Sequence, residues 1–223
     1  MWLLKALKSS IGQKYVMAIS GLLLCGFLVA HLAGNLLLYV GPEMYDAYAH
    51  KLHENEQLLI VAELGLFALF FLHIYLAFST RSMNTEARGV GYLEKQSKIE
   101  EKKQYALRPQ NWMFLSGSII LAYLILHLGD FKFDLRMSET SEMEPFQKAV
   151  HILKDGISVF AYIVGPIILA IHLSHGVQSS FQTLGWNHPK YNKLISVGGT
   201  LFAWIIGIGF ASFPIWALFM KGD

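Results

Sequence analysis

Five histidines lie within long apolar stretches of this 223-residue chain, where an ionisable side chain is costly and usually functional. They are His31, His73 and His127, followed by the close pair His172 and His175. A neutral imidazole can bind a metal ion or a haem iron, and it can also relay protons. For a single histidine, a hydrogen bond to a neighbouring helix is the commoner role. What matters is therefore how the five stand relative to one another.

The elements that must position these histidines are membrane-spanning helices. The chain is 54% apolar and only 15% charged, whereas a soluble domain carries about 25% charged residues. A helix needs about 20 apolar residues to cross a bilayer. We predict an all-α membrane protein with one transmembrane domain, 1–223, in which Glu63 is the only acid inside a span. The five spans are expected near 15–39, 57–80, 110–129, 156–180 and 195–219.

The Lys and Arg residues predict the orientation of these spans. They concentrate before the first span, between the second and third, and between the fourth and fifth, so the N-terminus is expected in the cytoplasm. Segment 81–108 is then the largest basic cytoplasmic surface. It could bind a soluble partner, or it could serve only as an orientation signal. A net charge of +2 does not indicate a nucleic-acid partner.

The N-terminal segment has some features of a signal peptide, because lysines precede an apolar run. The run is too long for that, and no A-x-A cleavage site follows it, so we expect it to be kept as the first span. The single cysteine, Cys25, excludes a disulfide framework and a Cys-rich metal site within this chain.

Depth in the membrane sorts four of the histidines into two pairs. Spans one and three run outward, and His31 and His127 each lie about 16 residues along their span, in the outer half. Spans two and four run inward, and His73 and His172 come late on them, in the inner half. Each pair comes from two helices, as two imidazoles on one haem iron require. The pattern predicts two haems b in a four-helix core formed by spans one to four.

A short repeat agrees with this pairing. Ser20-Gly21 precedes His31-Leu32 by eleven residues, and Ser116-Gly117 precedes His127-Leu128 by the same offset. Eleven residues make about three helical turns and about 16 Å of rise, so each serine shares a face with its histidine at the depth of the other pair. These small residues could let a flat porphyrin lie against the backbone, or they could simply favour close helix packing.

The remaining histidines are weaker candidates for a role in haem binding. His175 lies one turn after His172 and could compete for the inner site, contact a haem propionate or pack between helices. The other four fall in predicted loops or at span edges, where solvent exposure is expected. They are His50, His53, His151 and His188.

Taken in order along the chain, these motifs resemble the cytochrome b subunit of di-haem succinate dehydrogenases and fumarate reductases, the five-span membrane anchors of complex II. The resemblance covers nearly the whole chain. It implies that His73 and His172 bind the proximal haem and that His31 and His127 bind the distal haem. Its marks, besides the repeat, are Asn35, Phe71-Leu72-His73, Leu76-Ala77-Phe78, Asp130-Phe131-Lys132-Phe133, Ile171-His172-Leu173-Ser174-His175-Gly176 and Leu184-Gly185-Trp186.

The resemblance also implies partners and a location. An iron–sulfur protein and an FAD-binding flavoprotein would dock on the cytoplasmic face of a bacterial cytoplasmic membrane. The chain would exchange electrons between the iron–sulfur protein and a quinone, with menaquinone expected, as part of a tricarboxylic acid cycle enzyme. No catalytic residue for succinate or fumarate is expected in this chain.

The quinone site is the least defined feature. Asn35, one turn outward of His31, and Glu63, near the outer end of span two, are candidates, although a packing amide and an interface carboxylate are equally good interpretations. An inner site using Ser20 or Ser116 stays open. Some members of the family carry a carboxylate two residues before the fourth-span histidine, associated with proton movement. Here that residue is Ala170.

Two alternative functions remain open from the residues. One is the haem b subunit of another quinone-linked dehydrogenase, such as a formate dehydrogenase or a hydrogenase, although a fifth span without histidine counts against it. The other is a haem-free membrane anchor or transporter, in which the buried histidines pack or relay protons. An absorption spectrum of the purified protein separates these alternatives.

Overall fold

The computed structural model describes residues 5–6, 9–86 and 112–220, and in these residues it is helical with no strand. Five helices are long and apolar enough to cross a membrane, which confirms the predicted all-α membrane protein with five spans. They are α2 (Ser10–Asn35, continued by the short helix η1, Leu36–Tyr39), α4 (Glu56–Glu86), α5 (Met113–Phe131), α7 (Gly156–Thr183) and α8 (Pro189–Phe219). Most of the basic segment 81–108 lies outside the described residues.

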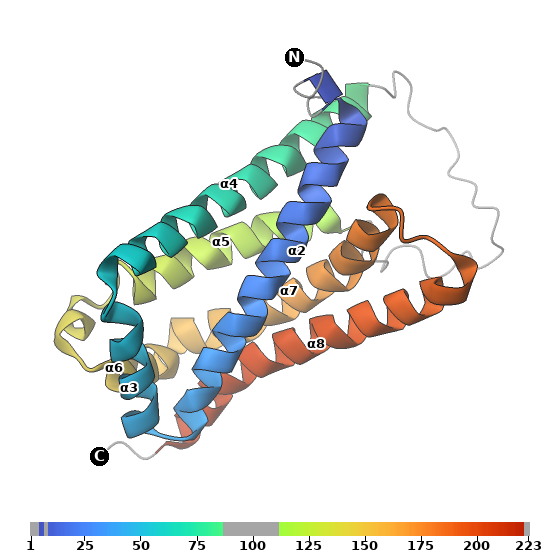
Figure 1. The fold of residues 1–223 in the computed structure, drawn as a ribbon. Helices are drawn as coiled ribbons and strands as arrows, with labels where there is room; N and C mark the ends of the chain where they lie inside the picture. The colour runs from blue at the N-terminus through green and yellow to red at the C-terminus, as the bar shows by residue number, and fades with distance from the viewer. Residues whose placement is uncertain (1–4, 7–8, 87–111, 221–223) are drawn as a thin grey trace.

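Three short helices gather at one end of the bundle: α3 (Pro42–His53), η4 (Ser138–Glu142) and α6 (Pro145–Lys154), beside the end of α8 (Figure 1). The start of α2 and the end of α4 lie at the opposite end (Figure 1). Following the predicted orientation, we call the end with α3 and α6 the outer end and the opposite one the inner end.

The short helices correct one expectation. His50, His53 and His151 lie on α3 and α6 and not in loops, because Pro42 and Pro145 occupy the first turn of these helices, where proline favours helix initiation. The three histidines and His188 are exposed, as the sequence predicted.

Two of the spanning helices begin earlier than their apolar runs. The side chain of Ser9 accepts a hydrogen bond from the backbone N–H of Gly12 at 3.1 Å, so α2 begins at Ser10 and includes Lys14. Helix α8 begins at Pro189, again with proline in the first turn. Charged residues near a membrane surface thus belong to these helices, although a prediction based on uncharged stretches leaves them out of the span.

Helix α8, which carries no histidine, packs closely along α7. A Cβ atom built on Gly207 would lie 2.6 Å from the Cβ of Ala170, so only glycine fits there. Small residues of this kind let spanning helices approach each other in a membrane. Helix α7 also packs against α2 and α5, and α2 packs against α4. The four spanning helices that carry histidine therefore pack as the pairs α2–α4 and α5–α7, joined through α2–α7.

Candidate functional site

The outer pair, His31 and His127, is brought together from α2 and α5. Their ring centroids lie 5.8 Å apart and their planes are inclined by 77°. A metal–imidazole bond is about 2 Å long, so two rings that bind one ion from opposite sides have centroids roughly 6 Å apart. The spacing of the outer pair matches this requirement.

Aromatic side chains surround the outer pair. Phe27 stacks on His31 with centroids 5.2 Å apart, and Tyr123 stacks on His127 at 6.0 Å, each from four residues earlier on the same helix. Tyr162 meets His127 edge-on at 5.8 Å. The buried Nδ1 of His127 has no hydrogen-bond partner in the described part of the chain. Since buried polar atoms almost always have a partner, an unpaired nitrogen in this position is unusual.

The inner pair, His73 and His172, is held differently. Nδ1 of His73 on α4 lies 3.1 Å from Oγ of Ser20 on α2. Nδ1 of His172 on α7 lies at the same distance, 3.1 Å, from Oγ of Ser116 on α5. The hydrogen bonds of the inner pair therefore involve all four helices α2, α4, α5 and α7.

The small residues of the repeat lie at the level of the inner pair, as the helical rise predicted. A Cβ atom on Gly21 would be 3.3 Å from Cε1 of His73, and a Cβ atom on Gly117 would be 3.5 Å from Cε1 of His172. Ser20 is eleven residues before His31 on α2, so the two levels are about 16 Å apart along that helix. The sequence did not predict that the serines hydrogen-bond to the histidines, and a contact of these residues with haem stays a prediction.

The other predicted site residues lie at different distances from these pairs. His175 lies half-buried on α7, one turn after His172. The side-chain amide of Asn35 donates to the carbonyl oxygen of His31 at 2.8 Å, so Asn35 adjoins the outer pair. Glu63 forms an ion pair with Lys132 at 2.5 Å, which links α4 to the segment after α5.

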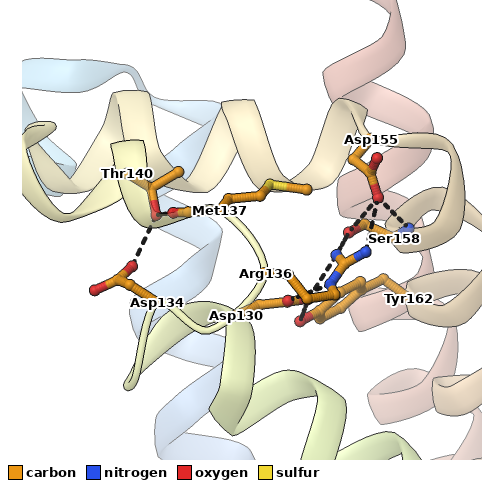
Figure 2. A network of polar contacts seen from close by, with 8 residues as sticks. All are labelled: Asp130, Asp134, Arg136, Met137, Thr140, Asp155, Ser158 and Tyr162. Atoms are coloured by element: carbon orange, nitrogen blue, oxygen red, sulfur yellow. Dashed lines mark hydrogen bonds and ion pairs between the residues drawn. The ribbon is translucent and has the colours of Figure 1, made fainter.

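A polar network beside the outer pair was missed by the sequence analysis (Figure 2). Its centre is Asp130, which is only 2% exposed at the end of α5. Nε and Nη2 of Arg136 donate to the two carboxylate oxygens at 2.6 and 3.0 Å, and the hydroxyl of Tyr162 donates to one of them at 3.0 Å. Because the ring of Tyr162 contacts His127, the network reaches the outer pair directly.

Arg136 also joins this network to the start of α7. It donates to Asp155 at 3.1 Å and to the hydroxyl of Ser158 at 2.5 Å. The hydrogen bonds with Asp130 raise the pKa of Arg136, and the backbone N–H of Ser158 lowers the pKa of Asp155. An outward-facing cavity of about 640 Å³ lies beside Arg136, Asp155 and His151. In the sequence these charges look like ordinary loop charges, and only the fold brings Tyr162 and Ser158 to them.

Asp134 links the loop that follows α5, which we call the outer loop, to α6. Its carboxylate accepts from Lys148 at 2.6 Å and from the hydroxyl of Thr140 at 2.7 Å. The hydrogen bond from Lys148 is the main reason why the pKa of Asp134 is lowered. Asp134 also has a positive φ of 48°, a conformation that Asp tolerates better than most residues.

The two histidine pairs match the number of ligands that a haem iron takes from a protein. Within the described residues, no group of three or more His, Cys, Asp or Glu side chains could hold a metal ion. A haem iron needs only two axial ligands from the protein, and each histidine pair offers two. No protein-family model matches the chain, and no curated protein or solved structure is significantly similar to it.

Proposed function

We propose that this chain is the membrane cytochrome b subunit of a succinate dehydrogenase or fumarate reductase and binds two haems b. His73 and His172 would hold the inner haem, and His31 and His127 the outer haem. The observation that carries the proposal is that four histidines from four helices lie at two levels about 16 Å apart along α2, where the outer two contact each other and each inner one contacts a serine of a facing helix. Haem b, when bound, supplies reversible one-electron chemistry at its iron.

The surrounding residues support this role. The aromatic rings of Phe27, Tyr123 and Tyr162 contact the outer pair and give it apolar surroundings, which suits a low-polarity redox site. The carboxylate of Asp130 is neutralised by Arg136, so no uncompensated charge is buried beside His127. Each imidazole can then act as a neutral ligand.

The proposed electron partners follow from the sequence resemblance. An iron–sulfur protein, joined to an FAD-binding flavoprotein that carries the dicarboxylate chemistry, would dock at the inner end in the bacterial cytoplasmic membrane. The other partner would be a quinone, with menaquinone expected, which takes up two electrons and two protons to become a quinol. The amide of Asn35, next to His31, is the better placed of the two candidate quinone residues, since Glu63 is engaged by Lys132.

The haem content of single-histidine variants tests the proposal. We expect His73→Ala and His172→Ala each to lose the same haem, and His31→Ala and His127→Ala each to lose the other. The measurements are a pyridine haemochrome assay and a redox titration of the detergent-purified protein. His53→Ala, at an exposed position on α3, is the matched control and should keep both haems.

Three results would count against the proposal. A colourless wild-type protein would contradict haem binding and would favour a haem-free anchor or transporter. Loss of different haems from His73→Ala and His172→Ala would contradict the pairing. Purification from native membrane without a flavoprotein or an iron–sulfur protein would contradict the succinate dehydrogenase assignment while leaving the haem sites intact.

A further inference from the structure

We infer that Ser20 and Ser116 are positioning residues that fix the tautomer of the inner histidines and thereby tune the electron affinity of the inner haem. The inference rests on the proposed function and goes beyond it. It assigns to each serine an action on a histidine of another helix, besides the direct porphyrin contact that the sequence suggested.

The direction of each hydrogen bond follows from a count of protons. Oγ of Ser20 lies 3.0 Å from the carbonyl oxygen of Met17 and 3.1 Å from Nδ1 of His73. A carbonyl oxygen can only accept, so the single hydroxyl proton of Ser20 goes to Met17. The oxygen of Ser20 is then left as an acceptor, and Nδ1 of His73 must donate. In a neutral imidazole, Nε2 consequently carries the lone pair that an iron requires.

The same arrangement occurs a second time. Oγ of Ser116 lies 3.1 Å from the carbonyl oxygen of Met113 and 3.1 Å from Nδ1 of His172. Ser20 is 1% exposed and Ser116 is 4% exposed, so water cannot replace either hydroxyl if it is removed. Two independent helix pairs thus present the two inner histidines in the same tautomer.

The glycine after each serine fixes the place of the ring. With a Cβ atom on Gly21, the distance to Cε1 of His73 would be 3.3 Å, and with one on Gly117 the distance to Cε1 of His172 would be 3.5 Å. The imidazoles therefore lie against the backbone of the facing helix. The serine sets the direction of the Nδ1–H bond, and the glycine leaves room for the ring beside it.

The outer pair lacks this device and serves as an internal control. Nδ1 of His127 has no hydrogen-bond partner in the described residues. Nδ1 of His31 is 3.5 Å from the amide nitrogen of Asn35, which itself donates to the carbonyl oxygen of His31 at 2.8 Å. In neither case does a hydroxyl accept from the ring.

When the ring nitrogen that does not bind the metal, here Nδ1, donates a hydrogen bond, the imidazole becomes a more basic ligand. A more basic ligand favours the oxidised metal. Removal of the serine hydroxyl should therefore raise the midpoint potential of the inner haem. If the ratio of the ferric to the ferrous binding constant of the site falls tenfold, the midpoint potential of the inner haem rises by about 59 mV.

The test is a redox titration with electron paramagnetic resonance of Ser20→Ala and Ser116→Ala in the purified holoprotein. We expect the potential and the low-spin g-values of the inner haem to change while those of the outer haem stay constant. Ser20→Thr keeps the hydroxyl and should retain the wild-type potential. Ser118→Ala is the control on α5, because Ser118 donates to Phe114 at 2.9 Å, is exposed and has no hydrogen bond to a histidine among those described.

The outcomes separate this inference from the proposed function. An unchanged inner potential in both alanine variants, even with a lower melting temperature, would show a merely structural role and overturn the inference alone. An equal shift of both haems, or a threonine variant that behaves like the alanine variant, would also overturn it. A wild-type protein without haem would overturn the inference and the proposed function together.

Discussion

The inner and outer histidine pairs use the same side chain in different surroundings. The inner pair is supported by serine hydroxyls and packed against glycines of the facing helices. The outer pair is surrounded by aromatic rings and joined through Tyr162 to a buried ion pair. Under the proposed function, one chemical ligand would therefore give two centres of different electron affinity, and the neighbouring helices would set the difference.

The two levels also differ in what stabilises them. The inner level depends on contacts between spanning helices, whereas the outer level depends on the loop after α5, since Arg136 binds both Asp130 and Asp155. A change in the outer loop should consequently act on the outer pair alone. The predictions below use this difference, and they add to the histidine and serine variants described above.

The largest effect is expected for Arg136→Ala. It leaves the buried carboxylate of Asp130 without its cation, and breaking a buried ion pair by removing one partner costs about 3–5 kcal/mol. We expect a strongly lowered melting temperature in detergent, with loss of the outer haem before the inner one. Lys132→Ala is the control, because the Lys132–Glu63 pair is partly exposed and should contribute at most about 1 kcal/mol. Equal destabilisation by the two variants would contradict the buried role of Asp130.

A smaller, more local effect is expected for Gly165→Ala on α7. The added Cβ atom would lie 2.5 Å from the ring of Tyr123, which stacks on His127, so the ring must move. Overpacking of this kind costs about 1–3 kcal/mol. The absorption spectrum and potential of the outer haem should change while those of the inner haem stay the same. Gly176→Ala on the same helix meets nothing within 4 Å and should leave both unchanged.

The smallest effect concerns pH and the outer loop. Because Lys148 lowers the pKa of Asp134, the folded state binds this proton less readily than the unfolded state does. The stabilisation is therefore complete above the ordinary pKa of about 4 and is lost as the pH falls through the lowered pKa. The protection of segment 132–148 against hydrogen exchange, measured relative to the intrinsic exchange rate at each pH, should fall on acidification below about pH 4. Asp134→Asn should abolish this dependence, and an unchanged dependence would assign it to another group.

The sequence was enough to predict the spans and the levels of the histidines, since both follow from apolar length and helical rise. It placed Ser20 and Ser116 at the depth of His73 and His172, which the structure shows in direct contact. The aromatic residue four positions before each outer histidine lies inside the repeat and could have been found by comparing its two copies position by position.

The network around Asp130 could not be predicted from the sequence. Its geometry depends on the path of the loop to Arg136 and on the register of α7, which presents Ser158 and Tyr162. The earlier start of α2 was missed for a simpler reason: the cap at Ser9 extends the helix past Lys14, outside any charge-free window. The family resemblance and the haem ligands stay predictions.

The close packing of α7 and α8 limits which substitutions position 170 can accept. Ala170 is fully buried, and its Cβ would lie 2.6 Å from a Cβ atom at Gly207, so a longer side chain has no room while the helices stay together. A larger residue at position 170 would therefore push α7 and α8 apart, and the two helices can change their contact residues only together.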